Sequence, residues 1–196
     1  SSMLLEERDS GVDMQLWTAP GNLEGEITER SDVTNAISEG TVTPDDSIAG
    51  EDLLIHQIEV NDFEGVIAAA EMNSDGDSGF ATLNTALTED ILKLSIEQAS
   101  PGQNQQAKTL NLQESAGALD VIYNASNEEL YVVADTEGLR FDQPSVDGTV
   151  PAETDDGEFD VTFTVTNQYE MSLEDDGESV TKSFSVTDRT VQLTED

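Results

Sequence analysis

The sequence predicts an all-β fold: an elaborated antiparallel Ig-like β-sandwich with at most one short helix. Three observations support this class: apolar and polar residues alternate with period two, turn signals recur about every 8 to 14 residues, and helical spacing is rare. In the stretch 158–166, Phe159, Val161 and Phe163 share one face, while Asp160 and Thr162 share the other. Such alternation is typical of antiparallel strands with one buried and one wet face.

Other stretches show the same alternation and are rich in Val, Thr and Phe, residues that fit a pleated sheet. The stretch 52–60 is the most apolar of them, so we expect it to be a central strand. The stretches 158–166 and 179–186 should form the final hairpin. We predict further strands at 12–18, 23–29, 91–98, 108–114, 118–123, 129–135 and 189–194.

Helical spacing occurs at one place, where Phe80, Leu83 and Leu87 predict a short helix from Phe80 to Glu89. No linker rich in Ser, Gly or Pro divides the chain. We therefore expect residues 1–11 to be a cloning remnant or flexible N-terminus and residues 12–196 to be a single β-sandwich domain. Two abutting β-domains that divide near residue 102 are the alternative.

The charge of the chain is extreme, with 43 acids, 7 bases and a formal net charge of −36 over 196 residues. Self-repulsion of this size destabilises a compact state in dilute buffer. Salt shortens the Debye length from about 10 Å at 0.1 M to about 3 Å at 1 M, so the composition favours a halophilic protein. A disordered chain and a nucleic-acid mimic are the rival interpretations, but alternating apolar residues and evenly spread acids argue against them. Direct binding of nucleic acid needs more Lys and Arg than are present.

The sequence lacks both cysteine and a long apolar segment, and each of these absences excludes a class of structure. The sequence has no cysteine, which excludes disulfides and thiolate metal sites. Its longest purely apolar run, 66–70, is far too short to span a membrane, so we expect no membrane insertion within this chain.

Clustered acids are the candidate metal ligands. Asp75 and Asp77 occupy alternate positions of a polar loop, but the EF-hand pattern fails because Ser78 stands where Gly is needed and Asn84 where Glu is needed. Asp-Asp-Gly turns supply the other candidates, Asp155 with Asp156 and Asp175 with Asp176. Weak binding of Ca²⁺, Na⁺ or K⁺ is one interpretation of these six aspartates. Solvated loop tips without a ligand are the other, and no further cofactor is expected.

No residue is predicted to be catalytic. His56, the single histidine, shares a strand face with Leu54 and Ile58, which is typical of a hydrogen-bonded core residue. Motifs for thiol–imidazole or multi-histidine zinc chemistry are absent from the sequence. Asn124 begins the sequon Asn-Ala-Ser in a predicted hairpin turn, which makes it a candidate glycosylation site.

Four stretches, 48–67, 94–112, 129–141 and 159–193, resemble parts of haloarchaeal cell-surface proteins, the S-layer-like surface glycoproteins. The resemblance implies an extracellular, non-catalytic structural or interaction module of an archaeal surface protein. Its partners would be other cell-envelope proteins or further copies of the chain. A carbohydrate-binding or adhesive module, using exposed aromatic residues, is one alternative. A secreted enzyme with paired carboxylates is another.

Overall fold

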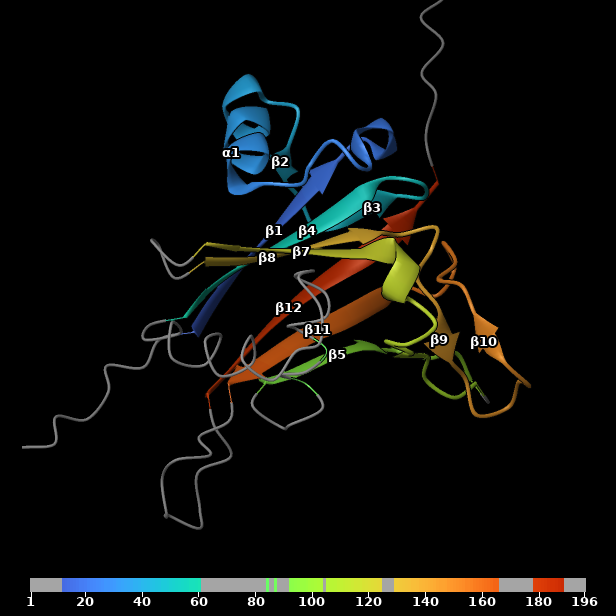
Figure 1. Cartoon of the computed structure of the whole chain (residues 1–196). Helices are drawn as coiled ribbons and strands as arrows, with labels where there is room; N and C mark the ends of the chain where they lie inside the picture. Colours follow the sequence, from blue (N-terminus) through green and yellow to red (C-terminus); the bar gives the residue numbers. More distant parts are fainter. Residues whose placement is uncertain are drawn as a thin grey trace, which may run out of the picture.

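A computed structural model describes residues 12–60, 84, 87, 92–103, 105–124, 129–165 and 178–188. Within these residues the chain forms a five-stranded and a seven-stranded sheet that pack face to face, with a helix over the outer face of the smaller sheet (Figure 1). The predicted all-β sandwich is confirmed.

The five-stranded sheet has the order β2-β1-β4-β8-β7 and is antiparallel throughout. Strand β4 pairs with β1 on one side and with β8 on the other, which confirms the predicted central position of the most apolar strand. The strands are β1 (Val12–Ala19), β2 (Thr43–Pro44), β4 (Leu53–Val60), β7 (Leu119–Asn124) and β8 (Glu129–Asp135).

The seven-stranded sheet has the order β10-β9-β6-β5-β11-β12-β3. Its strands are β3 (Ser47–Ala49), β5 (Leu92–Gln98), β6 (Thr109–Leu110), β9 (Phe141–Asp142), β10 (Thr149–Val150), β11 (Glu158–Val165) and β12 (Glu178–Thr187). Strands β11 and β12 pair antiparallel, so the predicted final hairpin is confirmed.

One pair departs from the predicted antiparallel arrangement, because β3 runs parallel to the end of β12. Only Asp45 and Asp46 separate β2, at the edge of one sheet, from β3, at the edge of the other. The chain therefore crosses between the sheets in a single step and continues beside β12 in the same direction.

The main core lies between the two sheets and consists of the inward residues of both. Phe159 is at its centre, with its ring centroid 5.1 Å from that of Phe141 and 5.5 Å from that of Phe184. Val161 and Phe163 are fully buried on the same side of β11, as the alternation predicts.

A second, smaller core covers the other face of the five-stranded sheet, beneath the helix. It contains Ile27 and Val33 from the covering segment and Ile55, Tyr131 and Val133 from β4 and β8. Strands β4 and β8 are thus buried on both faces. This explains why 52–60 reads as an almost continuous apolar run.

The strand predicted at 23–29 is wrong. Gly21–Leu23 form the 3-10 turn η1, the backbone turns through Gly25 at a φ of 73°, and the helix α1 (Arg30–Glu39) follows. The Asp32 carboxylate accepts a hydrogen bond of 2.9 Å from the Glu29 N–H, which caps the helix start. This bond and one from the Thr28 N–H lower the pKa of Asp32 below its usual range.

The helix α1 buries only Val33, so its sequence has little helical periodicity. The helix predicted from Phe80 to Glu89 falls outside the described residues, apart from Asn84 and Leu87, whose backbone is helical. A second 3-10 turn, η2 (Ala116–Ala118), precedes β7. None of the described helices is long and apolar enough to cross a membrane.

Strands from both sides of Gly102 occur in each sheet. Before that residue lie β4 and β5, which pair with β8 and β11 from beyond it. The described strands on the two sides of residue 102 thus share both sheets, and a single domain over residues 12–196 stays a prediction.

Candidate ion-pair and cation site

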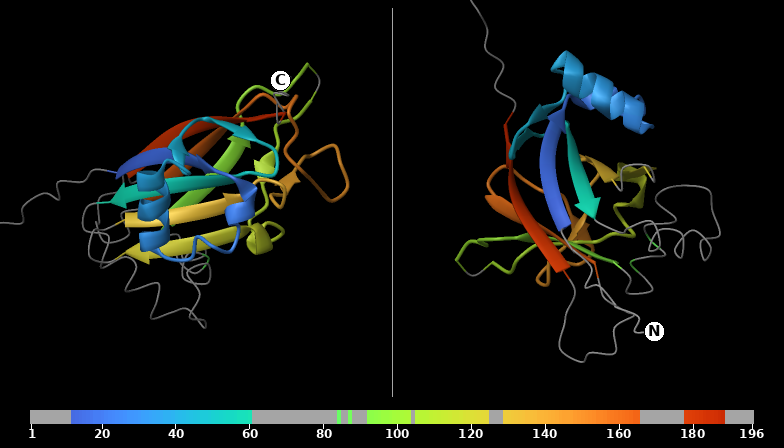
Figure 2. Two further views of the ribbon diagram at one scale, coloured as in Figure 1. Left: turned by 90° about the horizontal axis from the view of Figure 1, so that it is seen from above. Right: turned by 90° about the vertical axis from the view of Figure 1, so that its left-hand side faces the viewer.

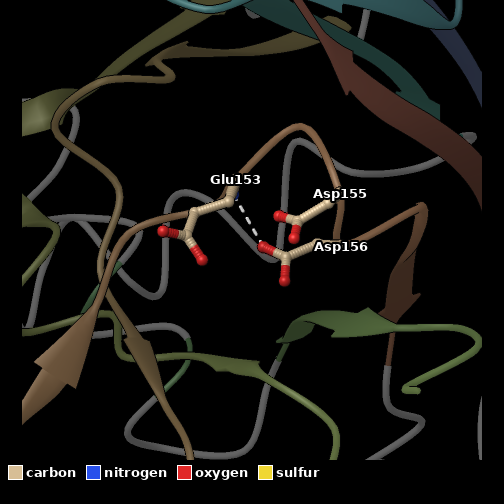
Figure 3. Close-up of side chains that lie close together, drawn as sticks. All are labelled: Glu153, Asp155 and Asp156. Carbon is tan, nitrogen blue, oxygen red and sulfur yellow. Dashed lines mark hydrogen bonds between the residues drawn. The ribbon is translucent and has the colours of Figure 1, made fainter.

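The acidic loop that joins β10 to β11 holds a cluster of three carboxylates. Glu153, Asp155 and Asp156 place one carboxylate oxygen each within 4.8 Å of the others (Figure 3). The turn is closed by a hydrogen bond of 3.1 Å from the Asp156 N–H to the Glu153 carbonyl. Gly157 then takes a φ of 78°, a left-handed conformation that favours glycine, and β11 begins.

The Lys108 side chain forms ion pairs with two carboxylates of this cluster. The Lys108 ammonium donates to Asp156 Oδ2 at 2.6 Å, to the Pro151 carbonyl at 3.1 Å and to Glu153 Oε2 at 3.4 Å. The same Asp156 oxygen accepts the Glu153 N–H at 2.6 Å. The Lys108 and Asp156 side chains are 5% and 8% exposed, so their ion pair is buried.

Gln98, at the end of β5, fixes the two partners relative to each other. Its side-chain amide donates to the Asp156 carbonyl at 2.7 Å, and its Oε1 accepts the Lys108 N–H at 3.3 Å. Its backbone N–H also donates to the Lys108 carbonyl at 2.9 Å. Each of the three side chains thus has a charged or polar partner, as a stable buried ion pair requires.

This arrangement changes the interpretation of two of the six candidate metal ligands. Asp156 already has an ammonium as its counter-ion, whereas Asp155 and Glu153 are exposed and can meet a cation from solvent. Sequence reasoning missed Lys108, because the strand pattern gives no signal that pairs it with a residue 48 positions away. Asp75, Asp77, Asp175 and Asp176 lie outside the described residues.

Weak cation binding at Asp155 and Asp156 stays a prediction, and because Lys108 already pairs with Asp156, we now expect Asp155 and Glu153 to supply the ligands. Two exposed carboxylates make a weak site, so we expect a dissociation constant on the order of 1 mM. At a tenfold excess over that value, calcium should stabilise the fold by about 1.4 kcal/mol. Thermal unfolding with 10 mM CaCl₂, against NaCl of equal ionic strength, measures this. The calcium response should vanish in Asp155→Asn. A response that Asp155→Asn leaves intact would contradict the site.

His56 lies in the main core, as predicted. It is 1% exposed, and its Nδ1–H donates to the Val132 carbonyl at 3.2 Å. Its Nε2 is buried and has no hydrogen-bond partner among the residues that the structure describes. Burial lowers the pKa of His56 from 6.5 to about 4, since no water is available to solvate an imidazolium there, and the Val132 carbonyl only partly offsets this.

We expect His56 to make stability depend on pH. Below pH 6.5 the unfolded chain takes up a proton at this histidine and the folded chain does not until about pH 4. Stability should therefore fall by about 3 kcal/mol as the pH drops through this window. Urea unfolding of the wild type and of His56→Leu in molar KCl, at pH 7 and pH 4, isolates the contribution. Equal pH slopes in the two proteins would refute it.

Comparison with known proteins finds several that are similar in sequence to this chain. It is 28% identical to a cell surface glycoprotein of Haloferax gibbonsii in an alignment that covers 100% of the chain. It is also 27% identical to cell surface glycoprotein 2 of Haloarcula hispanica, with 92% of the chain covered. This chain is related to the haloarchaeal cell surface glycoproteins. The resemblance seen in the sequence is confirmed, and the haloarchaeal source of the relatives agrees with the halophilic interpretation of the charge.

The chain spans about a fifth of these surface glycoproteins, 21% of the one from Haloferax and 20% of the one from Haloarcula. Cell surface glycoprotein 1 of Haloarcula hispanica is 25% identical, and the alignment covers 94% of the chain. None of the three names refers to an enzymatic activity. No protein-family model matches the chain, and no solved structure matches it significantly.

The relatives are named glycoproteins, and Asn124 is the candidate glycosylation site of this chain. It is the last residue of β7 and pairs with Glu129 of β8, so the predicted hairpin is confirmed, while the turn 125–128 lies outside the described residues. A hairpin turn is a suitable place for a sequon, because an oligosaccharide needs solvent around its acceptor.

We predict that Asn124 carries a glycan when the chain is secreted by a haloarchaeal host. Intact-mass spectrometry should find a mass above that of the bare polypeptide, and Asn124→Gln should remove the excess. Asn127→Gln, in the same turn but outside the sequon, is the matched control and should keep it. An unchanged mass in Asn124→Gln would exclude this residue as the acceptor.

A polar network on the outer face of the five-stranded sheet was not predicted. Glu129 Oε2 accepts from Arg30 Nε at 2.7 Å and from the Tyr131 hydroxyl at 3.2 Å. Beside it, the Trp17 indole N–H donates to Gln57 Oε1 at 2.9 Å. Burial and the Glu129 carboxylate raise the pKa of Tyr131 to about 12. Since Arg30 is the first residue of α1, the network fastens the helix to the sheet.

Proposed function

We propose that this chain is a non-catalytic extracellular structural module of a haloarchaeal cell-surface protein. Its partners are other envelope proteins or further copies of the chain. The observation that carries the proposal is the alignment of the whole chain with about a fifth of a cell surface glycoprotein. Such a share is what one module of a longer surface protein would occupy.

The acid cluster supports a structural role over a catalytic one. A glycosidase needs two carboxylates that act as acid and base across a cleft. Here the Asp156 carboxylate is bound by the Lys108 ammonium and the Glu153 N–H. The Asp156 backbone carbonyl accepts from the Gln98 side chain and so holds the loop against β5. The cluster is thus part of the scaffold of this module.

The alternative of a carbohydrate-binding module receives no support from the described aromatic residues. Sugar-binding faces use exposed aromatic rings, but Tyr131 is 1% exposed, and Trp17 and Tyr123 are partly buried against the two cores. Another tyrosine, Tyr169, lies outside the described residues.

Labelling of intact cells tests the proposed location. Antibodies raised against the chain should label unbroken cells of its source organism in molar salt. Antibodies against a cytoplasmic protein should label only lysed cells. Labelling of the chain that appears only after lysis would overturn the proposal.

A further inference from the structure

The sequence contains four Asp-Gly pairs, and the structure places two of them in contrasting surroundings. Asp147–Gly148 lie in the loop that joins β9 to β10, and Asp156–Gly157 lie at the end of the acidic loop before β11. The other two pairs, Asp75–Gly76 and Asp176–Gly177, are outside the described residues. An Asp-Gly pair is reactive because glycine has no side chain to hinder attack by its backbone nitrogen on the preceding carboxyl group.

The pair Asp147–Gly148 is open to solvent. The loop that carries it projects from the sandwich, and it is the orange loop at the right of the left-hand view in Figure 2. Both residues are exposed, and neither belongs to a strand. A Cβ placed on Gly148 would have no atom within 4 Å apart from its chain neighbours. The Asp147 side chain therefore has room to rotate toward the Gly148 nitrogen.

The pair Asp156–Gly157 is held on two sides. The Asp156 carboxylate accepts from the Lys108 ammonium and from the Glu153 N–H, each at 2.6 Å. The Asp156 backbone carbonyl accepts from the Gln98 amide at 2.7 Å, and this carbonyl shares a peptide bond with the Gly157 nitrogen. The carboxyl carbon can reach that nitrogen only if the buried ion pair breaks.

We propose that Asp147 isomerises spontaneously to isoaspartate and that the ion pair with Lys108 protects Asp156 from the same reaction. The Gly148 nitrogen forms a bond to Asp147 Cγ, the bond from Cγ to the carboxyl hydroxyl breaks, and the hydroxyl leaves with the amide proton as water. The product is a cyclic succinimide. Water from the solvent then opens the ring. Attack at Cγ restores aspartate, whereas attack at the backbone carbonyl gives isoaspartate, in which the main chain runs through Cγ.

The reaction changes the backbone of the loop and keeps its charge, because isoaspartate still carries one carboxylate. The main chain becomes longer by one carbon atom between residues 147 and 148. Pro144, Val146, Gly148 and Thr149 are among the residues that line a groove of about 590 Å³ beside this loop. Isomerisation therefore alters the rim of that groove as the protein ages, and it requires no enzyme. The inference goes beyond the proposed function, since it holds wherever the chain resides.

Mass spectrometry of the whole chain after incubation in 3 M KCl at pH 6 tests the contrast. Cleavage after glutamate places the two pairs in separate peptides, 138–153 and 154–158. Electron-transfer fragmentation distinguishes isoaspartate from aspartate, although their masses are equal. Isoaspartate should accumulate at Asp147 at least about ten times faster than at Asp156, because Asp156 reacts only after a buried ion pair breaks. Equal rates at the two residues would overturn the proposal.

Free peptides that span 142–152 and 151–161 separate the effect of the fold from that of the local sequence. Neither peptide contains Lys108 or Gln98, so the two Asp-Gly pairs should isomerise at similar rates. In the folded chain, Asp147 should react about as fast as in its peptide, while Asp156 should react far more slowly than in its own. If Asp147 were slowed in the folded chain as strongly as Asp156, the loop would be held in an unreactive conformation and the site would be refuted.

Two variants connect the rates to named residues. Lys108→Met releases the Asp156 carboxylate and should raise isomerisation at Asp156 at least tenfold, while Lys93→Met, the exposed control, should leave it unchanged. Gly148→Asn adds a side chain at a position where φ is 84°, a conformation that asparagine tolerates, and should slow isomerisation at Asp147 alone. An unchanged rate at Asp156 in Lys108→Met would refute the protection. An unchanged rate at Asp147 in Gly148→Asn would refute the role of this glycine.

Discussion

Replacing Lys108 with methionine is expected to lower the free energy of unfolding by about 3–5 kcal/mol. Methionine keeps much of the length and apolar stem of lysine but removes the ammonium that neutralises Asp156. The Asp156 carboxylate, 8% exposed, would then be buried with only the Glu153 N–H and no opposite charge. Urea unfolding in 3 M KCl, followed by circular dichroism, measures the loss.

Two variants separate the ion pair from other effects of the substitution. Lys93→Met makes the same chemical change at an exposed position of β5 and should alter stability by less than about 0.5 kcal/mol. The double variant Lys108→Met with Asp156→Leu removes both charges and should recover most of the loss, since apolar residues often replace a buried pair without penalty. If Lys108→Met were as mild as Lys93→Met, the buried pair would not stabilise the fold.

The strands with one buried face could be predicted from the sequence because their burial follows the period of the backbone. Phe159, Val161 and Phe163 alternate with polar residues, and the structure buries all three. The same argument placed His56 in the core. The helix α1 could not be found in this way, because it covers the sheet with little more than Val33. Its capping residues Glu29 and Asp32 were the available signal.

The ion pair shows a different limit of sequence reasoning. Asp155 and Asp156 were recognisable as an acidic turn, but a chain with 43 acids has many such turns. What distinguishes this one is the buried ammonium of Lys108, the residue just before β6, which tertiary folding brings to the acidic turn. A lysine in a chain that has only three could have been examined as a structural residue. Its partner could not have been named without the fold.

We expect the folded state to be only marginally stable in dilute buffer and clearly stable in molar NaCl or KCl. The repulsion between carboxylates extends over about 10 Å at 0.1 M salt but over only about 3 Å at 1 M salt. For a chain of this size each kcal/mol of relieved repulsion raises Tm by about 2–4 °C. A rise of about 10–20 °C between 0.1 and 3 M NaCl therefore corresponds to about 2.5–10 kcal/mol of relieved repulsion. Thermal unfolding followed by circular dichroism measures it.

Salt also strengthens the burial of apolar surface, so the Coulombic origin of the effect needs its own test. A variant that changes the exposed Glu24, Glu26 and Glu137 to Gln and the exposed Asp147 to Asn keeps the apolar core unchanged. If repulsion governs stability, this variant should melt higher than the wild type at 0.1 M NaCl and gain less from added salt. Parallel salt curves for the two proteins would assign the effect to apolar burial. A Tm that stays flat in the wild type would contradict halophilic folding itself.

Since the four positions lie away from Lys108 and Asp156, any change they cause reflects the net charge and leaves the buried ion pair intact.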